Sequence, residues 1–214
     1  MKRRHDAPAC RDGEVRLALG VGGLVLSGLA VNDHAIGPVE TAVFRVVNRL
    51  PDLLYRPGWV VMQAGNVSAA PLAGLIALCA GRRRLAARLV LTGLTTWTLA
   101  KLIKRLYHRP RPAGLVDEVH FRGPAASGMG YVSGHTGIAI GIGVAVFPEL
   151  RPAAQLATAL AVPTVGLCRM YVGAHLPLDV IGGAALGLAV DATVNRLLNA
   201  SPGTGCRSSF RRSW

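Results

Sequence analysis

Six long apolar runs constrain the fold of this chain more than any other sequence feature. A helix needs about 20 predominantly apolar residues to cross a bilayer core, and runs near that length recur along the sequence, although the fourth is short. Of the 214 residues, 51% are hydrophobic and only 16% are charged, whereas soluble domains carry about a quarter charged residues. The sequence therefore predicts an all-α, polytopic membrane protein with six transmembrane helices in a bundle. The expected spans are residues 16–31, 58–80, 86–103, 136–147, 153–172 and 178–197.

We expect a single transmembrane domain over residues 16–198, between a short cytoplasmic segment, 1–15, and a cytoplasmic tail, 199–214. The tail is polar, basic and rich in Gly and Ser, which predicts disorder. The first apolar run follows a basic start, as in a signal peptide, but no convincing small-residue cleavage site follows it. Because five more runs come after it, we expect this run to be retained as a helix.

Lysine and arginine are distributed unevenly between alternate loops, and this asymmetry predicts the orientation in the membrane. Both termini are expected in the cytoplasm, and segments 32–57 and 104–135 are expected outside, in a multi-pass protein of the inner (plasma) membrane. The second outer segment breaks the rule because it is strongly basic. A basic cluster on that side needs another explanation, such as an anion to bind. Its members are Lys104, Arg105, Arg109 and Arg111.

The net charge of +13 raises the question of nucleic-acid binding. Aromatic residues make up only 5% of the chain, and the basic residues lie between apolar runs. Stacking platforms and basic grooves are therefore not expected, and we predict no nucleic-acid partner. The cysteines show neither the paired spacing of a disulfide framework nor that of a zinc site. They are Cys10, Cys79, Cys168 and Cys206.

Residues 38–50 have the periodicity of an amphipathic helix. Apolar residues stand at positions 39, 42, 43, 46, 47 and 50, which lie on one side of a helix. Glu40, Arg45, Asn48 and Arg49 occupy much of the remaining surface. The pattern predicts a short helix that either lies on the outer membrane interface or packs on the surface of the bundle.

The first of three polar clusters ends the third apolar run, at residues 104–112. Pro110 and Pro112 cannot continue a helix, so the chain leaves in an extended form, and Arg111 turns back towards the side that Lys104 faces. An ammonium and a planar guanidinium together suit phosphate oxygens. The alternative is that these side chains reach to lipid head groups as simple anchors.

The second cluster, Ser133-Gly134-His135, directly precedes the fourth run. A glycine-containing turn that opens a helix exposes backbone N–H groups, and the helix dipole favours an anion there. Gly134 allows close approach of the backbone, and His135 lies within reach of the same anion. The alternative is an ordinary N-cap beside an incidental histidine.

The third cluster joins the fifth and sixth runs and contains Arg169, His175 and Asp179. A charged residue inside an apolar helix is costly and usually marks a functional site. Pro177 suits the first turn of the last helix, which places Asp179 where the dipole favours its ionised form. Asp179 can then accept the Nδ1–H of His175, leaving Nε2 as a nucleophile or base. The alternative is an ordinary interfacial His–Asp pair.

The predicted topology brings all three clusters to the same outer face. Together they supply three cations, two histidines, a hydroxyl group, one carboxylate and a helix N-terminus. No pair of acidic residues is available nearby to hold Mg²⁺, so we expect no metal and no other cofactor. The set favours phosphoryl transfer through a histidine.

These residues resemble the three-part signature of the type-2 phosphatidic acid phosphatase superfamily. That signature is Lys, six residues, Arg-Pro; then Pro-Ser-Gly-His; then Ser-Arg, five residues, His, three residues, Asp. All three spacings match in order across Lys104–Asp179, and the six-span layout covers nearly the whole chain. Two positions depart from the pattern: Val132 replaces the usual proline and Cys168 the usual serine.

The resemblance implies catalytic roles for three residues. His175 would attack phosphorus and form a phosphohistidine, while Asp179 would hold its ring. His135 would protonate the leaving oxygen and later activate water. The other site residues would bind the phosphoryl oxygens. They are Lys104, Arg111, Ser133, Gly134 and Arg169.

The resemblance also implies a membrane-embedded hydrolase acting on a lipid phosphate or diphosphate. A polyprenyl diphosphate, such as undecaprenyl diphosphate, is the first expected substrate. Phosphatidylglycerol phosphate, phosphatidate and a polyprenyl-phosphoryl sugar phosphate are the alternatives. A function of another class is non-catalytic binding of lipid phosphates, but binding alone would not require both His135 and His175.

Overall fold

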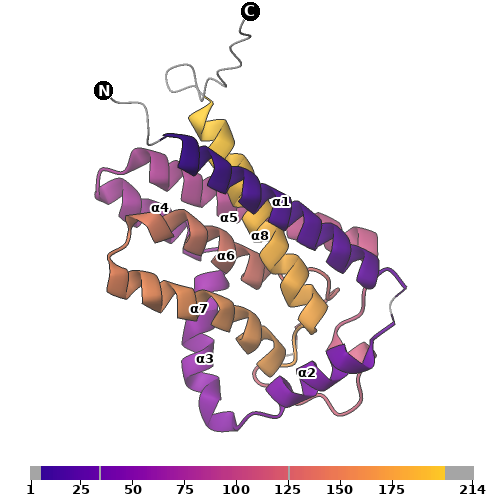
Figure 1. Ribbon diagram of the computed structural model, residues 1–214. Coiled ribbons are helices and arrows are strands. Elements are labelled where there is room, and N and C mark those ends of the chain that lie inside the picture. Colours follow the sequence, from indigo (N-terminus) through magenta and orange to yellow (C-terminus); the bar gives the residue numbers. More distant parts are fainter. Residues whose placement is uncertain (1–5, 34, 125, 201–214) are drawn as a thin grey trace, which may run out of the picture.

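The computed structural model describes residues 6–33, 35–124 and 126–200, and these residues fold into helices and loops without a strand (Figure 1). Of the predicted tail, all but the first two residues lie outside the described part of the chain. The all-α fold class is confirmed. The described residues form eight α-helices: α1 (Asp6–Ala30), α2 (Pro38–Asn48), α3 (Tyr55–Met62), α4 (Ala69–Cys79), α5 (Arg83–Tyr107), α6 (Gly134–Val146), α7 (Pro152–Tyr171) and α8 (Pro177–Asn199). Four short 3₁₀ helices complete the order: η1 (Asp52–Leu54), η2 (Gln63–Gly65), η3 (Pro112–Gly114) and η4 (Phe147–Glu149).

Three of these helices are long and apolar enough to cross a membrane, namely residues 12–30 of α1, α7 and α8. A bent pair, Asp52–Gly65 with Ala69–Cys79, makes a fourth candidate. Helix α5 has 25 residues, but its middle contains four threonines, which lower its mean hydropathy. Helix α6 has 13 residues, fewer than the roughly 17 that a full span needs. The count of six spans therefore stays a prediction.

The span expected over residues 58–80 is not one continuous helix. The chain forms α3, η2 and α4, and the two parts are bent by 67°. At the break, a Cβ on Gly65 would lie 2.4 Å from the carbonyl oxygen of His135. Only glycine permits this approach, so the break brings the backbone of η2 against the first turn of α6.

Helix α2 forms where the periodicity predicted it, and it packs on the bundle against α7 and α8. Its polar side differs from the prediction, because Glu40 and Asn48 are buried rather than part of a solvated face. The Asn48 amide nitrogen donates to the carbonyl oxygens of His120 and Tyr171 at 2.9 and 3.0 Å. Internal partners therefore outweigh the polarity of these side chains.

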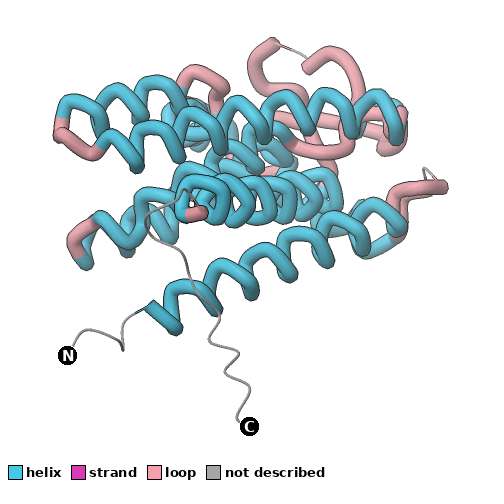
Figure 2. The backbone as a smooth tube through the Cα atoms, turned by 90° about the horizontal axis from the view of Figure 1, so that it is seen from above, coloured by secondary structure: helices cyan, strands magenta, loops and turns pink. Residues whose placement is uncertain are grey.

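Helix α8 is the central helix of the bundle, lying beside α1 and also packing against α5 and α6 (Figure 1). The long helices run side by side, and most loops lie at the two ends of the bundle (Figure 2). Where α8 meets the start of α6, a Cβ on Gly183 would lie 2.3 Å from the carbonyl oxygen of Ser133. This close contact fixes the distance between the two helix ends that carry the second and third polar clusters.

We expect Gly183→Ala to destabilise the protein by about 1–3 kcal/mol, the usual cost of overpacking a close contact. The added methyl group would push the Ser133 carbonyl away from α8. Thermal unfolding in detergent measures the effect. Gly22→Ala is the matched control, because a Cβ on Gly22 meets no other atom within 4 Å. Equal melting temperatures for the two variants would contradict the prediction.

Candidate active site

The three polar clusters meet at one end of the bundle. This end is formed by the C-terminal ends of α5 and α7 and the N-terminal ends of α6 and α8 (Figure 1). Helix α2 and the 26-residue connection between α5 and α6, residues 108–133, lie at the same end. The opposite end carries the arginines that precede and begin α5, Arg82, Arg83 and Arg84.

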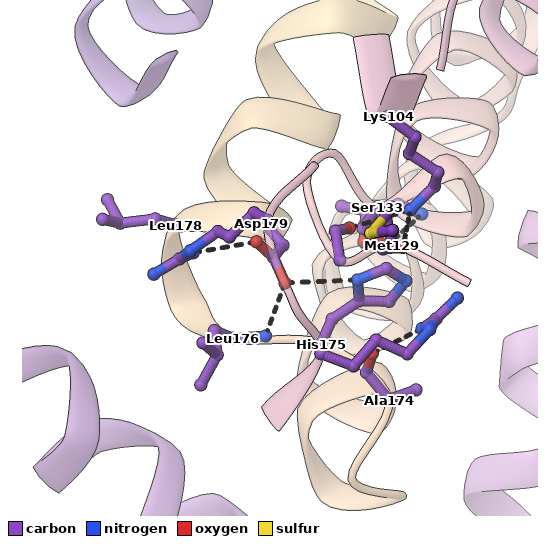
Figure 3. Close-up of polar contacts among 12 residues, drawn as sticks. Lys104, Met129, Ser133, Ala174, His175, Leu176, Leu178 and Asp179 are labelled. Atoms are coloured by element: carbon purple, nitrogen blue, oxygen red, sulfur yellow. Dashed lines mark hydrogen bonds and ion pairs between the residues drawn. The ribbon is translucent and has the colours of Figure 1, made fainter. Parts of the chain in front are cut away.

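Asp179 stands in the first turn of α8 and receives three donors on its carboxylate. Its Oδ2 lies 3.4 Å from Nδ1 of His175 and accepts the backbone N–H of Leu176 at 2.9 Å (Figure 3). Its Oδ1 accepts from the Arg109 guanidinium at 2.9 Å. Among the described residues, Nε2 of His175 has no protein hydrogen bond. The arrangement therefore orients the ring by Nδ1 and leaves Nε2 available for chemistry.

The loop between α7 and α8 places His175 against this carboxylate. The backbone N–H groups of Ala174 and His175 both donate to the carbonyl oxygen of Arg169, at 3.0 and 3.2 Å. Gly173 has a φ of 77°, which glycine adopts without strain. In this position His175 is buried, with 2% of the residue exposed.

Three cations surround the histidines, and each is held by neutral groups. Lys104 Nζ donates to the carbonyl oxygens of Met129 and Gly130, both at 2.8 Å. Arg111 donates to the carbonyl oxygen of Ala174 at 2.6 Å and to those of Ser127 and Gly128. Arg169 lies 3.9 Å from the sulfur of Met62, and its buried Nε has no partner in the described part of the chain.

The positive charge of these three cations is not neutralised by the described residues. None of the three forms an ion pair with a described acid. The ion pairs of Asp179 are instead with Arg109 and His175. Burial, and then the neighbouring Arg111, lower the pKa of Lys104 to about 7, and a bound anion would favour its charged form. All three cations are half-buried, and charges that are partly removed from water are normally paired, so this arrangement indicates that an anion is the missing partner.

Burial lowers the pKa of His175 well below its usual range, and the nearby Lys104, Arg169 and Arg111 lower it further. The imidazole is therefore neutral at pH 7 when no anion is bound. A neutral ring carries the free electron pair that nucleophilic attack requires. An anion bound among the three cations would offset their charge and favour the imidazolium.

Ser133 is the N-cap of α6, as one of the two sequence interpretations proposed. Its Oγ accepts from the Thr136 hydroxyl at 2.9 Å and from the Thr136 backbone N–H at 3.5 Å. Its own backbone N–H donates to the carbonyl oxygen of Asp179 at 2.8 Å. The capping role leaves the hydroxyl proton of Ser133 free to point towards an anion, so capping and binding are compatible. His135 is half-buried in the first turn of α6.

Two residues of this end were missed by sequence reasoning as parts of the site. Arg109 was noted only as a member of the basic segment, and Glu40 was placed on a polar surface. Arg109 is fully buried and pairs with both Glu40 and Asp179. The one available signal was the position of Arg109 in a basic segment that breaks the topology rule. Nothing in the sequence pattern connects Glu40 to it, 69 residues away.

The two departures from the family signature are both packing residues. Val132 is fully buried in a cluster with Tyr131 and Leu186. Cys168 is a free thiol, buried beside Met62 and Tyr171. Neither side chain forms a hydrogen bond with a site residue in the part of the chain that the structure describes. Among the described residues, no group of three His, Cys, Asp or Glu side chains is arranged to hold a metal ion.

Comparisons with known proteins agree with this geometry. A family model described as PAP2 superfamily matches residues 72–202, which include all eight predicted site residues. A "Lipid A 1-phosphatase" from Rhizobium etli is 37% identical over 94 residues, which are 42% of this chain and 40% of that protein. This chain therefore aligns with less than half the length of that relative.

Two crystal structures have a similar fold. The structure of Aquifex aeolicus LpxE superposes with a TM-score of 0.65 at 25% identity, covering 72% of this chain and 93% of that one. A transmembrane PAP2-type phosphatidylglycerolphosphate phosphatase from Bacillus subtilis superposes with a TM-score of 0.66 at 20% identity, covering 84% of this chain and 96% of that one. The fold is thus that of a multi-pass integral membrane protein.

If a bound anion completes this site, Arg169→Met is expected to raise the melting temperature in phosphate-free detergent. The change removes a charge without an acidic partner and keeps the side-chain volume similar. Each kcal/mol gained raises Tm by about 2–4 °C in a chain of this size. The same variant is expected to lose the stabilisation that added phosphate gives the wild type.

Arg45→Met is the matched control, because Arg45 is exposed on α2 and should change neither quantity. The inference of a missing anion would be wrong if Arg169→Met lowered Tm while phosphate still stabilised the variant as much as the wild type.

Proposed function

Because the chain belongs to the PAP2 superfamily, we propose that it is an integral membrane phosphatase that hydrolyses a lipid phosphate through a phosphohistidine. The observation that carries the proposal is the set of three cations without acidic partners around a buried, neutral His175. A phosphoryl group supplies the negative charge that this site lacks. A non-catalytic binding protein would not need the His175–Asp179 contact, because binding an anion does not require an oriented histidine ring.

In the first half-reaction, Nε2 of His175 attacks phosphorus in line with the bond to the leaving oxygen. The P–N bond forms as the P–O bond breaks. His135, which takes up a proton once the bound phosphoryl group offsets the positive charge around it, gives that proton to the leaving oxygen. The ring of His175 becomes positively charged, and Asp179 stabilises that charge through Nδ1. In the second half-reaction, His135 removes a proton from water, which attacks phosphorus and releases phosphate from His175.

The phosphate-binding groups are proposed to act on the three non-bridging oxygens. Lys104, Arg111 and Arg169 contribute positive charge from α5, the following loop and α7. Ser133 and the Gly134 N–H contribute hydrogen bonds from the start of α6, where the helix dipole adds to the attraction. These groups stabilise the charge that moves during transfer, so the proposed reaction needs no metal ion.

We propose a lipid whose phosphate is carried on a polar head group as the substrate. Two of the similar proteins are named for such lipids, lipid A 1-phosphate and phosphatidylglycerol phosphate. A polyprenyl diphosphate, the first expectation from the sequence, carries its phosphate directly on the lipid chain and is now the competing candidate. Since the short segment at the opposite end carries Arg82, Arg83 and Arg84, as cytoplasmic loops do, we place the active site on the extracytoplasmic side.

The proposed activity predicts that purified protein releases phosphate from a lipid phosphate in the presence of EDTA. Orthovanadate is expected to inhibit, because it adopts the five-coordinate geometry of the transferring phosphoryl group. A panel of lipid A, phosphatidylglycerol phosphate, phosphatidate and undecaprenyl diphosphate identifies the preferred class by kcat/KM. A strict requirement for added Mg²⁺, or release from none of these lipids, would contradict the proposal.

The two histidines are expected to give different defects. His175→Asn should abolish turnover and the phosphoenzyme together, because no other described group is placed to attack. His135→Asn should slow hydrolysis of a lipid phosphate by roughly 10²–10⁴-fold, the usual contribution of general acid–base catalysis. The loss should be smaller for an aryl phosphate, whose leaving group needs little protonation.

Rapid quenching with ³²P-labelled substrate detects the acid-labile phosphoenzyme. Undiminished label in His175→Asn would refute the assignment and make His135 the candidate nucleophile.

A further inference from the structure

Glu40 and Arg109 form a buried ion pair directly behind the proposed catalytic dyad, and the mechanism above does not use it. Arg109 is 0% exposed and Glu40 is 7% exposed. The two terminal nitrogens of Arg109 donate to both oxygens of Glu40, Nη2 to Oε2 at 2.7 Å and Nη1 to Oε1 at 3.2 Å. Glu40 Oε1 also accepts the backbone N–H of Leu178 at 3.0 Å, which ties α2 to the first turn of α8.

The Arg109 guanidinium divides its donors unequally between the two carboxylates. Both terminal nitrogens face Glu40, and only Nη1 also donates to Asp179, at Oδ1. The second oxygen of Asp179 is therefore left to His175 and to the Leu176 N–H. Paired N–H groups of arginine bind a carboxylate most strongly when both oxygens are engaged, so the orientation of the fork decides which oxygens of Asp179 are free.

We propose that Glu40 and Arg109 are positioning residues of the phosphatase reaction. Glu40 holds the guanidinium so that Arg109 donates to one oxygen of Asp179 and not to both. This arrangement keeps Oδ2 available to orient His175 and to stabilise its positive charge during transfer. The inference rests on the proposed function, because it concerns how that reaction is supported.

Removing the charge of Glu40 changes this division. A neutral partner holds a guanidinium less tightly than a carboxylate does, and the remaining buried anion in contact with Arg109 is then Asp179. Arg109 would turn its fork towards Asp179 and compete with His175 for Oδ2. The expected consequence is slower attack by His175, with the phosphate-binding groups unchanged.

Glu40 comes from a part of the chain that the family match does not include, since that match begins at residue 72. It lies on the inner side of α2, whose opposite side exposes Val39, Val43 and Val46. One short helix therefore supplies a buried carboxylate to the site and presents an apolar surface outward. Residues 72–202, which the family model matches, contain every signature residue but not Glu40.

The test compares Glu40→Gln with wild type in detergent, using the best substrate of the panel. We expect kcat to fall by roughly 10- to 100-fold, as when the partner behind a functional histidine is removed, while KM stays nearly unchanged. Glu118→Gln is the matched control, because Glu118 is an exposed acid of the same end that pairs with Arg49. It should retain wild-type kcat and KM.

A spectroscopic measurement separates positioning from a loss of folded protein. In ¹⁵N-histidine-labelled protein, the Nδ1–H resonance of His175 is identified by its absence in His175→Asn. We expect this resonance to shift or broaden in Glu40→Gln. A signal that keeps its position and only loses intensity in step with kcat would indicate partial unfolding and overturn the proposal.

A second variant keeps the proposal testable if Glu40→Gln fails to fold because the buried charge of Arg109 has lost its partner. The double change Glu40→Leu with Arg109→Met removes both charges and fills the space with apolar groups. We expect it to fold and to remain slow, because Asp179 has lost its Arg109 donor. Wild-type kcat in this double variant would show that the pair serves folding alone and would overturn the proposal.

The outcome also separates this inference from the proposed function. If wild-type protein and Glu118→Gln hydrolyse the substrate and Glu40→Gln equals them, the positioning role is wrong and the phosphatase proposal stands. If the wild type hydrolyses none of the lipids, the phosphatase proposal has failed, and the positioning role fails with it.

Discussion

The arrangement of the active-site end depends on the contacts of the Asp179 carboxylate. Its two oxygens join the guanidinium of Arg109, the ring of His175 and the backbone N–H of Leu176, while its backbone carbonyl receives the N–H of Ser133. One residue therefore links the loop after α5, the loop after α7 and the start of α6. Its place in the first turn of α8 adds a helix N-terminus that favours the ionised form.

Around that contact the molecule maintains an excess of positive charge at low exposure. Carbonyl oxygens of the loop between α5 and α6 orient Lys104 and Arg111 without neutralising them. A site of this kind is less stable when empty than an apolar one would be. The same charge would favour an anion over a neutral ligand of similar size, because a neutral ligand does not compensate the three cations.

The fold class and the meeting of the three polar clusters at one end of the bundle follow from the sequence, because both depend on local patterns. Apolar runs predict helices, and prolines at 38, 152 and 177 begin three of them. The spacing from Arg169 to Asp179 brings His175 onto the carboxylate because a helix end and one short loop separate them. These relations extend over about ten residues and leave little room for other conformations.

The parts that sequence reasoning missed depend on contacts between distant segments. The break between α3 and α4 exists where Gly65 meets His135, and no hydropathy pattern reports the approach of two backbones. The helical periodicity around Glu40 is the same whether its side chain faces water or is buried against Arg109, so the pattern cannot distinguish the two cases. Burial of such a side chain is decided by its partner, and the partner is 69 residues away.

The contact between Gly65 and His135 has a stereochemical consequence. Because η2 lies against the backbone of His135, the first turn of α6 is packed in place, and in the proposed reaction the imidazole moves by rotation about its own side-chain bonds. If the same ring protonates the leaving oxygen and then activates water, the alcohol departs and the water enters on one side of phosphorus. Two in-line displacements through that single side leave a chiral thiophosphate with the configuration it had at the start.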